Sequence, residues 1–277
     1  MTHVQEWKTA LSTAKTDEES FRFFLKNGIS AIEISMRWDL YAGIDWHAVQ
    51  SSADATGMEL WSLHLPFSGE INIASPDEKC RRHAVQVHCG LIEKGAAIGI
   101  TRYVVHPSAE PIADEERPAW MNAAKKSLSE LAQHAALHGS VICVEDLPRT
   151  CLGNTADEML ELLTADDRLR VCFDVNHLLT TAGCTHQEFV DKLGSKIVTT
   201  HMSDYDFVDE KHFFAGNGML DWKMVIDALE AADYCGPFLF EGGFAPNAKM
   251  PEVPIGKHEE AHERHLQIKS FRGRSSL

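Results

Sequence analysis

The chain has few basic residues and no long apolar run, and each absence excludes a class of protein. Lys and Arg number 26 against 41 Asp and Glu, which gives a formal net charge of −15 at pH 7. A protein that binds a nucleic-acid backbone needs clustered Lys and Arg, so this balance argues against a nucleic-acid partner. No apolar run approaches the roughly 20 residues that span a bilayer, and residues 1–11 are too polar for a signal core. We therefore expect no membrane segment and no export signal.

The chain also lacks a paired-cysteine motif. Its seven cysteines are an odd number, and none forms a C-x-x-C pair. Cys143 and Cys172 lie inside apolar runs and are predicted to be small buried hydrophobic residues. Reduced thiols without an export signal indicate the cytoplasm.

Short apolar runs typical of buried strands alternate with helical patterns along the whole chain. Strict alternation predicts a parallel sheet. Eight such units without a linker favour a closed α/β barrel, the (β/α)8 TIM barrel, over a doubly wound sheet, with residues 1–277 forming a single domain. The predicted strands cover 7–12, 31–35, 58–65, 102–106, 141–145, 170–174, 196–201 and 237–241. The predicted helices cover 18–27, 45–56, 75–98, 118–138, 155–164, 185–193, 221–232 and 257–271.

Six of these strands carry a side chain that binds metals or handles protons at the last residue or the one before it, namely His64, His106, Glu145, Asp174, His201 and Glu241. In a parallel barrel the carboxyl ends of all strands meet on one face, where active sites lie. A single glutamate at a strand end is usually solvated or paired with a lysine. Glu145, Asp174, His201 and Glu241, however, end four consecutive strands, and three carboxylates with one imidazole suit one divalent metal ion, Mn²⁺, Mg²⁺, Co²⁺ or Zn²⁺.

The local sequences around this quartet resemble those of the xylose isomerase-like barrel superfamily. The matching segments are V-E-D-L-P at 144–148, C-F-D-V-N-H at 172–177, T-H-M-S-D at 200–204 and F-E-G-G at 240–243. That superfamily includes sugar and sugar-phosphate isomerases and epimerases, together with endonucleases of the endonuclease IV type. The resemblance implies that the quartet binds the metal. It also implies that Glu145 and Glu241 are the catalytic acid/base pair on opposite sides of a bound sugar.

Four histidines, His64, His106, His177 and His212, form an outer ring for which two roles stay open. In the isomerase branch, the resemblance implies that such residues bind substrate hydroxyls or orient metal ligands, and we predict substrate binding. In the endonuclease branch, His64 and His106 would hold one additional zinc. His177 and His212 would hold another with Asp209 or Glu210. Trp38, Trp61, Phe67 and Phe214 could line a sugar ring, or could be ordinary core and loop residues.

These observations predict a divalent-metal-dependent isomerase or epimerase of a small sugar or related hydroxy-ketone. Moving a proton at a carbon next to a carbonyl needs a base and a Lewis acid, and two glutamates with a metal supply both through a cis-enediolate. The alternatives are a zinc-dependent phosphodiesterase of the endonuclease IV type, a metal-dependent keto-polyol dehydratase and a non-catalytic sugar-binding barrel. A homodimer or homotetramer is expected from how such barrels pair, and nothing in the sequence fixes the number.

Overall fold

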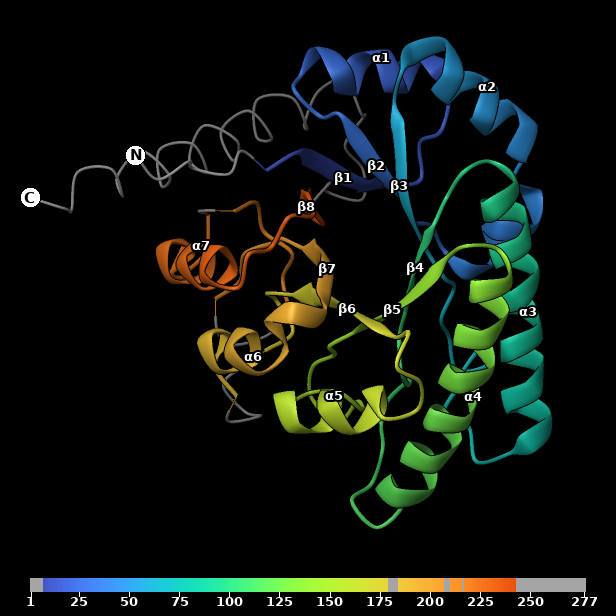
Figure 1. Ribbon diagram of the computed structural model, residues 1–277, viewed down its shortest axis with the longest axis vertical. Coiled ribbons are helices and arrows are strands. Elements are labelled where there is room, and N and C mark those ends of the chain that lie inside the picture. The colour runs from blue at the N-terminus through green and yellow to red at the C-terminus, as the bar shows by residue number, and fades with distance from the viewer. Residues whose placement is uncertain (1–6, 179–183, 207–209, 216, 243–277) are drawn as a thin grey trace, which may run out of the picture.

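The structure, a computed structural model, describes residues 7–178, 184–206, 210–215 and 217–242. Eight parallel strands form a nearly closed barrel in the order β7-β6-β5-β4-β3-β2-β1-β8, and a parallel bridge between Met202 and Phe240 joins its two edges. Figure 1 shows the strands at the centre with the helices around them. The strands are β1 (Thr9–Thr13), β2 (Ala31–Ile34), β3 (Glu59–His64), β4 (Arg102–Val105), β5 (Val141–Glu145), β6 (Arg170–Asp174), β7 (Ile197–His201) and β8 (Phe238–Phe240).

The predicted alternation of strands and helices is confirmed over the described residues. The helices are α1 (Glu18–Lys26), α2 (Trp46–Thr56), α3 (Glu78–Ala97), α4 (Arg117–Leu137), α5 (Ala156–Leu163), α6 (His186–Leu193) and α7 (Trp222–Ala231), with 3₁₀ turns η1 (Trp38–Gly43) and η3 (Gly194–Lys196). The helix predicted at 257–271 lies outside the described residues. None of the helices that the structure describes is long and apolar enough to cross a membrane.

Side-chain caps fix where most of the helices begin. An Asp or Thr side chain accepts a hydrogen bond from the backbone N–H three residues further on, which satisfies a donor that the helix cannot pair internally. The start predicted at 75 is therefore wrong by a few residues. Asp77 accepts from the N–H of Cys80, so α3 begins at Glu78. The capping residues are Asp17, Asp45, Asp77, Thr155, Thr185 and Asp221.

Apolar side chains fill the barrel interior on the amino-terminal side of the strand ends. The small residues Ala10 and Ala31 leave room for the indole of Trp61, which donates to the Thr199 hydroxyl at 3.1 Å. Cys143 and Cys172 are fully buried beside Val104, as predicted. This plug fills the barrel interior below the carboxyl ends of the strands, where active sites of such barrels lie.

Candidate metal centre

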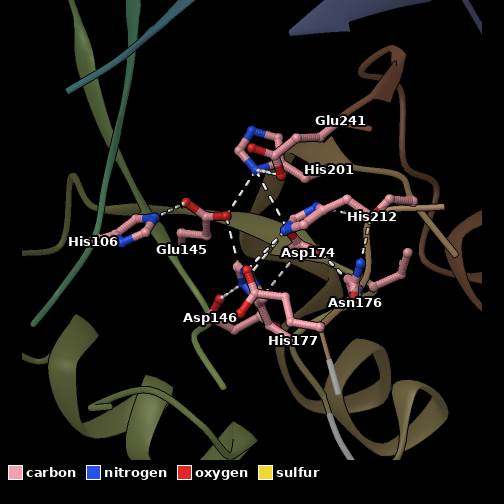
Figure 2. A network of polar contacts seen from close by, with 12 residues as sticks. His106, Glu145, Asp146, Asp174, Asn176, His177, His201, His212 and Glu241 are labelled. Atoms are coloured by element: carbon pink, nitrogen blue, oxygen red, sulfur yellow. Dashed lines mark hydrogen bonds and ion pairs between the residues drawn. The ribbon is translucent and has the colours of Figure 1, made fainter. Parts of the chain in front are cut away.

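The four predicted ligands come together at the carboxyl ends of neighbouring strands. Nδ1 of His201 lies 2.8 Å from Oε1 of Glu145, 3.1 Å from Oε2 of Glu241 and 3.7 Å from Oδ2 of Asp174. One donor atom from each residue lies within 4.8 Å of all the others. Figure 2 shows the four side chains pointing towards one another. The spacing in sequence thus becomes one cluster in space.

The backbone fixes this geometry residue by residue. β5, β6 and β7 end on Glu145, Asp174 and His201, as predicted, whereas Glu241 follows the last residue of β8. The N–H of Glu241 donates to the carbonyl of Met202 across the barrel seam at 3.2 Å. That bond holds Glu241 beside His201, although its strand is only three residues long.

The cluster has the features of a site built for a cation. Oδ2 of Asp174 and Oε2 of Glu241 are buried and have no hydrogen-bond donor. A buried carboxylate oxygen without a partner is costly, and a divalent metal would satisfy it. Three carboxylates and one imidazole are also the hard and borderline donors that Mn²⁺, Mg²⁺, Co²⁺ and Zn²⁺ accept. The residues therefore fit the metal that the sequence predicted.

Burial and close charges perturb the pKa values of the quartet strongly. Burial alone would raise the pKa of Glu145, but His201 and His106 outweigh it and hold that pKa well below its usual range. Burial raises the pKa of Asp174 to about 6, against the opposing effect of His177 and His201. Burial lowers the pKa of His201, yet the anionic groups around it raise that pKa well above its usual value. A dense set of opposed charges is typical of functional sites.

Glu33 is a residue of this site to which the sequence analysis assigned no role. It lies in β2 and is fully buried, and its Oε1 accepts from Nε2 of His201 at 3.0 Å. Hydroxyls of Ser12 and Ser62 donate to the same carboxylate at 3.1 and 2.8 Å. A carboxylate cannot donate, so Nε2 of His201 carries a proton, and Nδ1 is the nitrogen that faces the quartet and would bind a metal. In the sequence, the feature that could have indicated this role was a single glutamate within an otherwise apolar predicted strand.

Two of the outer histidines lie against Glu145. Nε2 of His64 and Nε2 of His106 are each 3.1 Å from Oε2 of Glu145. The Nδ1–H of His64 donates to the carbonyl of Leu65 at 3.0 Å, which orients the ring. Glu145 opposes burial and raises the pKa of His64 to about 9, so this imidazole is positively charged at neutral pH. His64 and His106 therefore both contact the second oxygen of Glu145, and the ring of His64 also stacks on that of His201, with centroids 5.7 Å apart.

The other two outer histidines lie beside Glu210, and Nδ1 of His177 also lies 3.6 Å from Oδ2 of Asp174 in the quartet. Nε2 of His212 lies 2.8 Å from Oε1 of Glu210, and Nε2 of His177 lies 3.6 Å from the same oxygen. The Nδ1–H of His177 donates to the carbonyl of Asp146 at 2.7 Å, so its Nε2 is the nitrogen that faces Glu210. One donor atom from each of the three residues lies within 4.8 Å of the others, whereas Asp209 lies outside the described residues.

Asp146 and Asn176 also belong to the site, and the sequence analysis gave them no role. Oδ1 of Asp146 accepts from the N–H of Asp174 at 2.8 Å, and Asn176 donates from its side chain to Ser203 at 2.8 Å. Burial raises the pKa of Asp146 well above its usual value. Both residues lie beneath the quartet in Figure 2 and tie the ends of β5, β6 and β7 together. In the sequence, their position next to the predicted ligands, in the V-E-D and D-V-N-H segments, was the feature that could have indicated a role.

Of the four aromatic residues considered for a sugar-binding wall, Phe67 lies at the site. Its ring stacks on His106 with centroids 3.7 Å apart, and it is half exposed. Trp61 is inside the barrel plug, under the guanidinium of Arg102. Phe214 is buried, and Trp38 is exposed on η1. Phe67 therefore offers an apolar surface beside the polar cluster.

Comparisons with known proteins agree with this architecture. An uncharacterised protein, MJ1311 of Methanocaldococcus jannaschii, is 31% identical over 193 residues, which cover 65% of this chain and 63% of that protein, less than two thirds of its length. A probable endonuclease 4 of Thermoplasma acidophilum is 23% identical over 223 residues, covering 74% of this chain and 73% of that protein. A solved D-tagatose 3-epimerase-like protein superposes with a TM-score of 0.80 at 24% identity, over 96% of this chain and 99% of its own.

The sequence profile of one family covers most of the described barrel. It matches residues 21–261, from α1 to beyond the last described strand, and so includes every residue of the quartet. The family is described as the xylose isomerase-like TIM barrel. The resemblance expected from the quartet sequences is thereby confirmed, and the chain belongs to the xylose isomerase-like TIM barrel family.

Proposed function

We propose that the protein is a divalent-metal-dependent epimerase or isomerase that acts on a small sugar or a related hydroxy-ketone. The observation that carries the proposal is the placement of two carboxylates, Glu145 and Glu241, on either side of Nδ1 of His201, at 2.8 and 3.1 Å. With Asp174 they complete a donor set for one metal. The D-tagatose 3-epimerase-like protein, which shares the fold, supports the sugar class.

Each residue of the quartet has a part in this chemistry. A metal held by Glu145, Asp174, His201 and Glu241 would polarise a substrate carbonyl and stabilise the negative charge of an enediolate. The side chain of Glu241 is 23% exposed, and its Oε2 has no hydrogen-bond donor. It can therefore reach a substrate carbon, remove the proton next to the carbonyl and return it.

Glu145 is the partner on the opposite side. It is almost fully buried, and its Oε2 lies 3.1 Å from Nε2 of His64 and 3.1 Å from Nε2 of His106. A proton delivered to or taken from Glu145 can be exchanged with His64, whose pKa of about 9 keeps it protonated at neutral pH. Phe67 covers this side with an apolar ring, while His177 and His212 offer polar groups to substrate hydroxyls on the other.

The test is exchange of substrate hydrogen with solvent deuterium. The protein, reconstituted with Mn²⁺ or Co²⁺, is incubated in D₂O with a panel of unphosphorylated ketoses, and deuterium next to the carbonyl is measured by NMR. Because general acid–base catalysis contributes about 10²–10⁴-fold, Glu241→Gln should slow exchange by that factor. Glu59→Gln, at the start of β3 and far from the quartet, is the control. Unchanged exchange in both Glu145→Gln and Glu241→Gln would rule out the two-glutamate mechanism.

A second function, metal-dependent phosphodiester hydrolysis, is favoured by one specific observation. Two further groups of possible ligands lie at the quartet. One is His177, Glu210 and His212, and the other adds His64 to the quartet members Glu145 and His201. Several metals close together suit phosphate-ester hydrolysis. The net charge of −15 opposes binding to a DNA backbone, so we place this function second. Two or three zinc ions per chain together with nicking of abasic DNA would reverse the order, whereas about one metal ion per chain supports the epimerase.

A further inference from the structure

We propose that the protein carries a second, structural metal site on its outer surface, formed by Glu93, His134 and His138, which takes a borderline transition metal such as Zn²⁺. One donor atom from each of the three residues lies within 4.8 Å of the others. Glu93 lies in α3, His134 lies in α4, and His138 is the residue that follows α4. The proposal is independent of the proposed activity, since none of these residues belongs to the quartet or its outer ring.

The backbone of α4 orients the two histidines together. Residues four apart on a helix lie on one face, one turn above the other, so His134 and His138 present their rings side by side. Their ring centroids are 5.1 Å apart. Two imidazoles at this spacing offer two nitrogen donors of the kind that Zn²⁺, Cu²⁺ and Ni²⁺ prefer. A pair of this kind needs a third ligand to become a specific site.

Glu93 supplies that third ligand from the neighbouring helix. Its Oε1 lies 3.3 Å from Nε2 of His134, and this nitrogen is buried yet has no hydrogen bond of acceptable geometry. Two histidines and one glutamate leave the fourth position of tetrahedral zinc to water. Ligands about 2.0–2.2 Å from zinc lie roughly 3.3 Å from one another, and the exposed side chains of Glu93 and His138 can rotate to that distance.

The position of the group explains what a metal would do there. α3 and α4 lie side by side in Figure 1. The amino-terminal part of α3 is joined to α4 through Arg81, which contacts Ser127 and Glu130. The site lies at the other end of the pair, near the carboxyl-terminal ends of both helices, which carry partial negative charge. A cation bound there would be stabilised by both helix ends and would link them.

This end of the helices is also the end of the barrel opposite the quartet. His138 precedes β5 by only three residues, and Glu93 precedes β4 by nine. The site therefore lies near the amino-terminal ends of these strands, the face of such barrels that contributes stability rather than catalysis. A metal bound here is accordingly expected to leave the chemistry at the quartet unchanged.

Zinc binding by the whole protein tests the proposal. Bound Zn²⁺ is measured by equilibrium dialysis and elemental analysis for the wild type, His134→Gln, His138→Gln, Glu93→Gln and Asp174→Asn. His83→Gln, which removes an exposed histidine elsewhere on α3, is the matched control. Glutamine has a good helix propensity, so these surface changes should preserve the fold, and circular dichroism checks it.

The expected result is one fewer Zn²⁺ per chain in His134→Gln and in His138→Gln than in the wild type and His83→Gln. Asp174→Asn should keep this zinc while losing metal at the quartet, so the two sites are scored separately. Glu93→Gln should bind the surface zinc at least tenfold more weakly. Equal zinc in the wild type and both histidine variants would overturn the site, and an unchanged affinity in Glu93→Gln would overturn its three-ligand form.

Discussion

Replacing Glu33 by glutamine should weaken metal binding at the quartet without unfolding the barrel. The carboxylate of Glu33 accepts from Nε2 of His201 at 3.0 Å and so directs Nδ1 towards Glu145, Asp174 and Glu241. Glutamine has nearly the same shape, but it removes the negative charge that fixes the ring. Loss of such an outer partner typically costs 10–100-fold in metal affinity, or about 1.4–2.7 kcal/mol.

The loss of affinity should grow as the pH rises. Burial lowers the pKa of His201, but the anionic groups near it, Glu33 among them, raise that pKa well above its usual value. Protons therefore compete with the metal more strongly in the wild type than in Glu33→Gln. At acidic pH this competition reduces the difference in metal affinity between the wild type and Glu33→Gln. At alkaline pH the competition is absent, so the difference reflects the full effect of the Glu33 carboxylate on the orientation of His201.

Competition titration of Mn²⁺ or Co²⁺ with a fluorescent chelator at several pH values measures this difference. ¹⁵N NMR of His201 gives a second reading, because the wild type should show a proton on Nε2. Glu59→Gln, which changes a carboxylate at the opposite end of the barrel, is the control. An affinity in Glu33→Gln within twofold of the wild type at alkaline pH would refute the reasoning, as would a proton on Nδ1 of His201 in the metal-bound wild type.

Three further results are expected from other parts of the barrel. Burial lowers the pKa of His88 to about 4, so the folded state loses stability as the pH falls from about 6.5 to 4. Between pH 7.5 and 5, the free energy of urea unfolding should fall by about 2 kcal/mol more in the wild type than in His88→Gln. Equal losses in the two proteins would contradict the lowered pKa of His88. For protein loaded with Mn²⁺ alone, chelation of this ion from the quartet should lower the melting temperature by on the order of 5–10 °C, as measured by calorimetry, but not in Asp174→Asn, which lacks a quartet ligand. Gly218→Ala would place a Cβ 2.4 Å from Oδ1 of Asp204, so urea unfolding should show a destabilisation of about 1–3 kcal/mol, and a change below about 0.5 kcal/mol would mean that the loop adapts.

The sequence by itself determined the order of the elements and the face on which the site lies. Parallel strands buried on both sides read as short apolar runs, and caps and glycines mark the helices between them. A strand that ends on Glu145 or Asp174 places that side chain at the barrel mouth whatever the details of packing. The quartet, His64 and His106 were therefore predictable once the alternation was recognised, whereas His177 and His212, which lie in loops, were predicted from the family resemblance.

Only the tertiary structure decided which partners surround each of these residues. Glu33 lies 168 positions from His201 in sequence, and neither its strand nor its spacing indicates that the two meet inside the barrel. In the same way, Glu210 joins His177 and His212 because the segment after β7 folds back over the end of β6. The surface group of Glu93, His134 and His138 likewise requires two helices packed in one register. Local patterns report propensity and burial, whereas the choice of partner depends on strand curvature, helix packing and loop path, which are properties of the whole barrel.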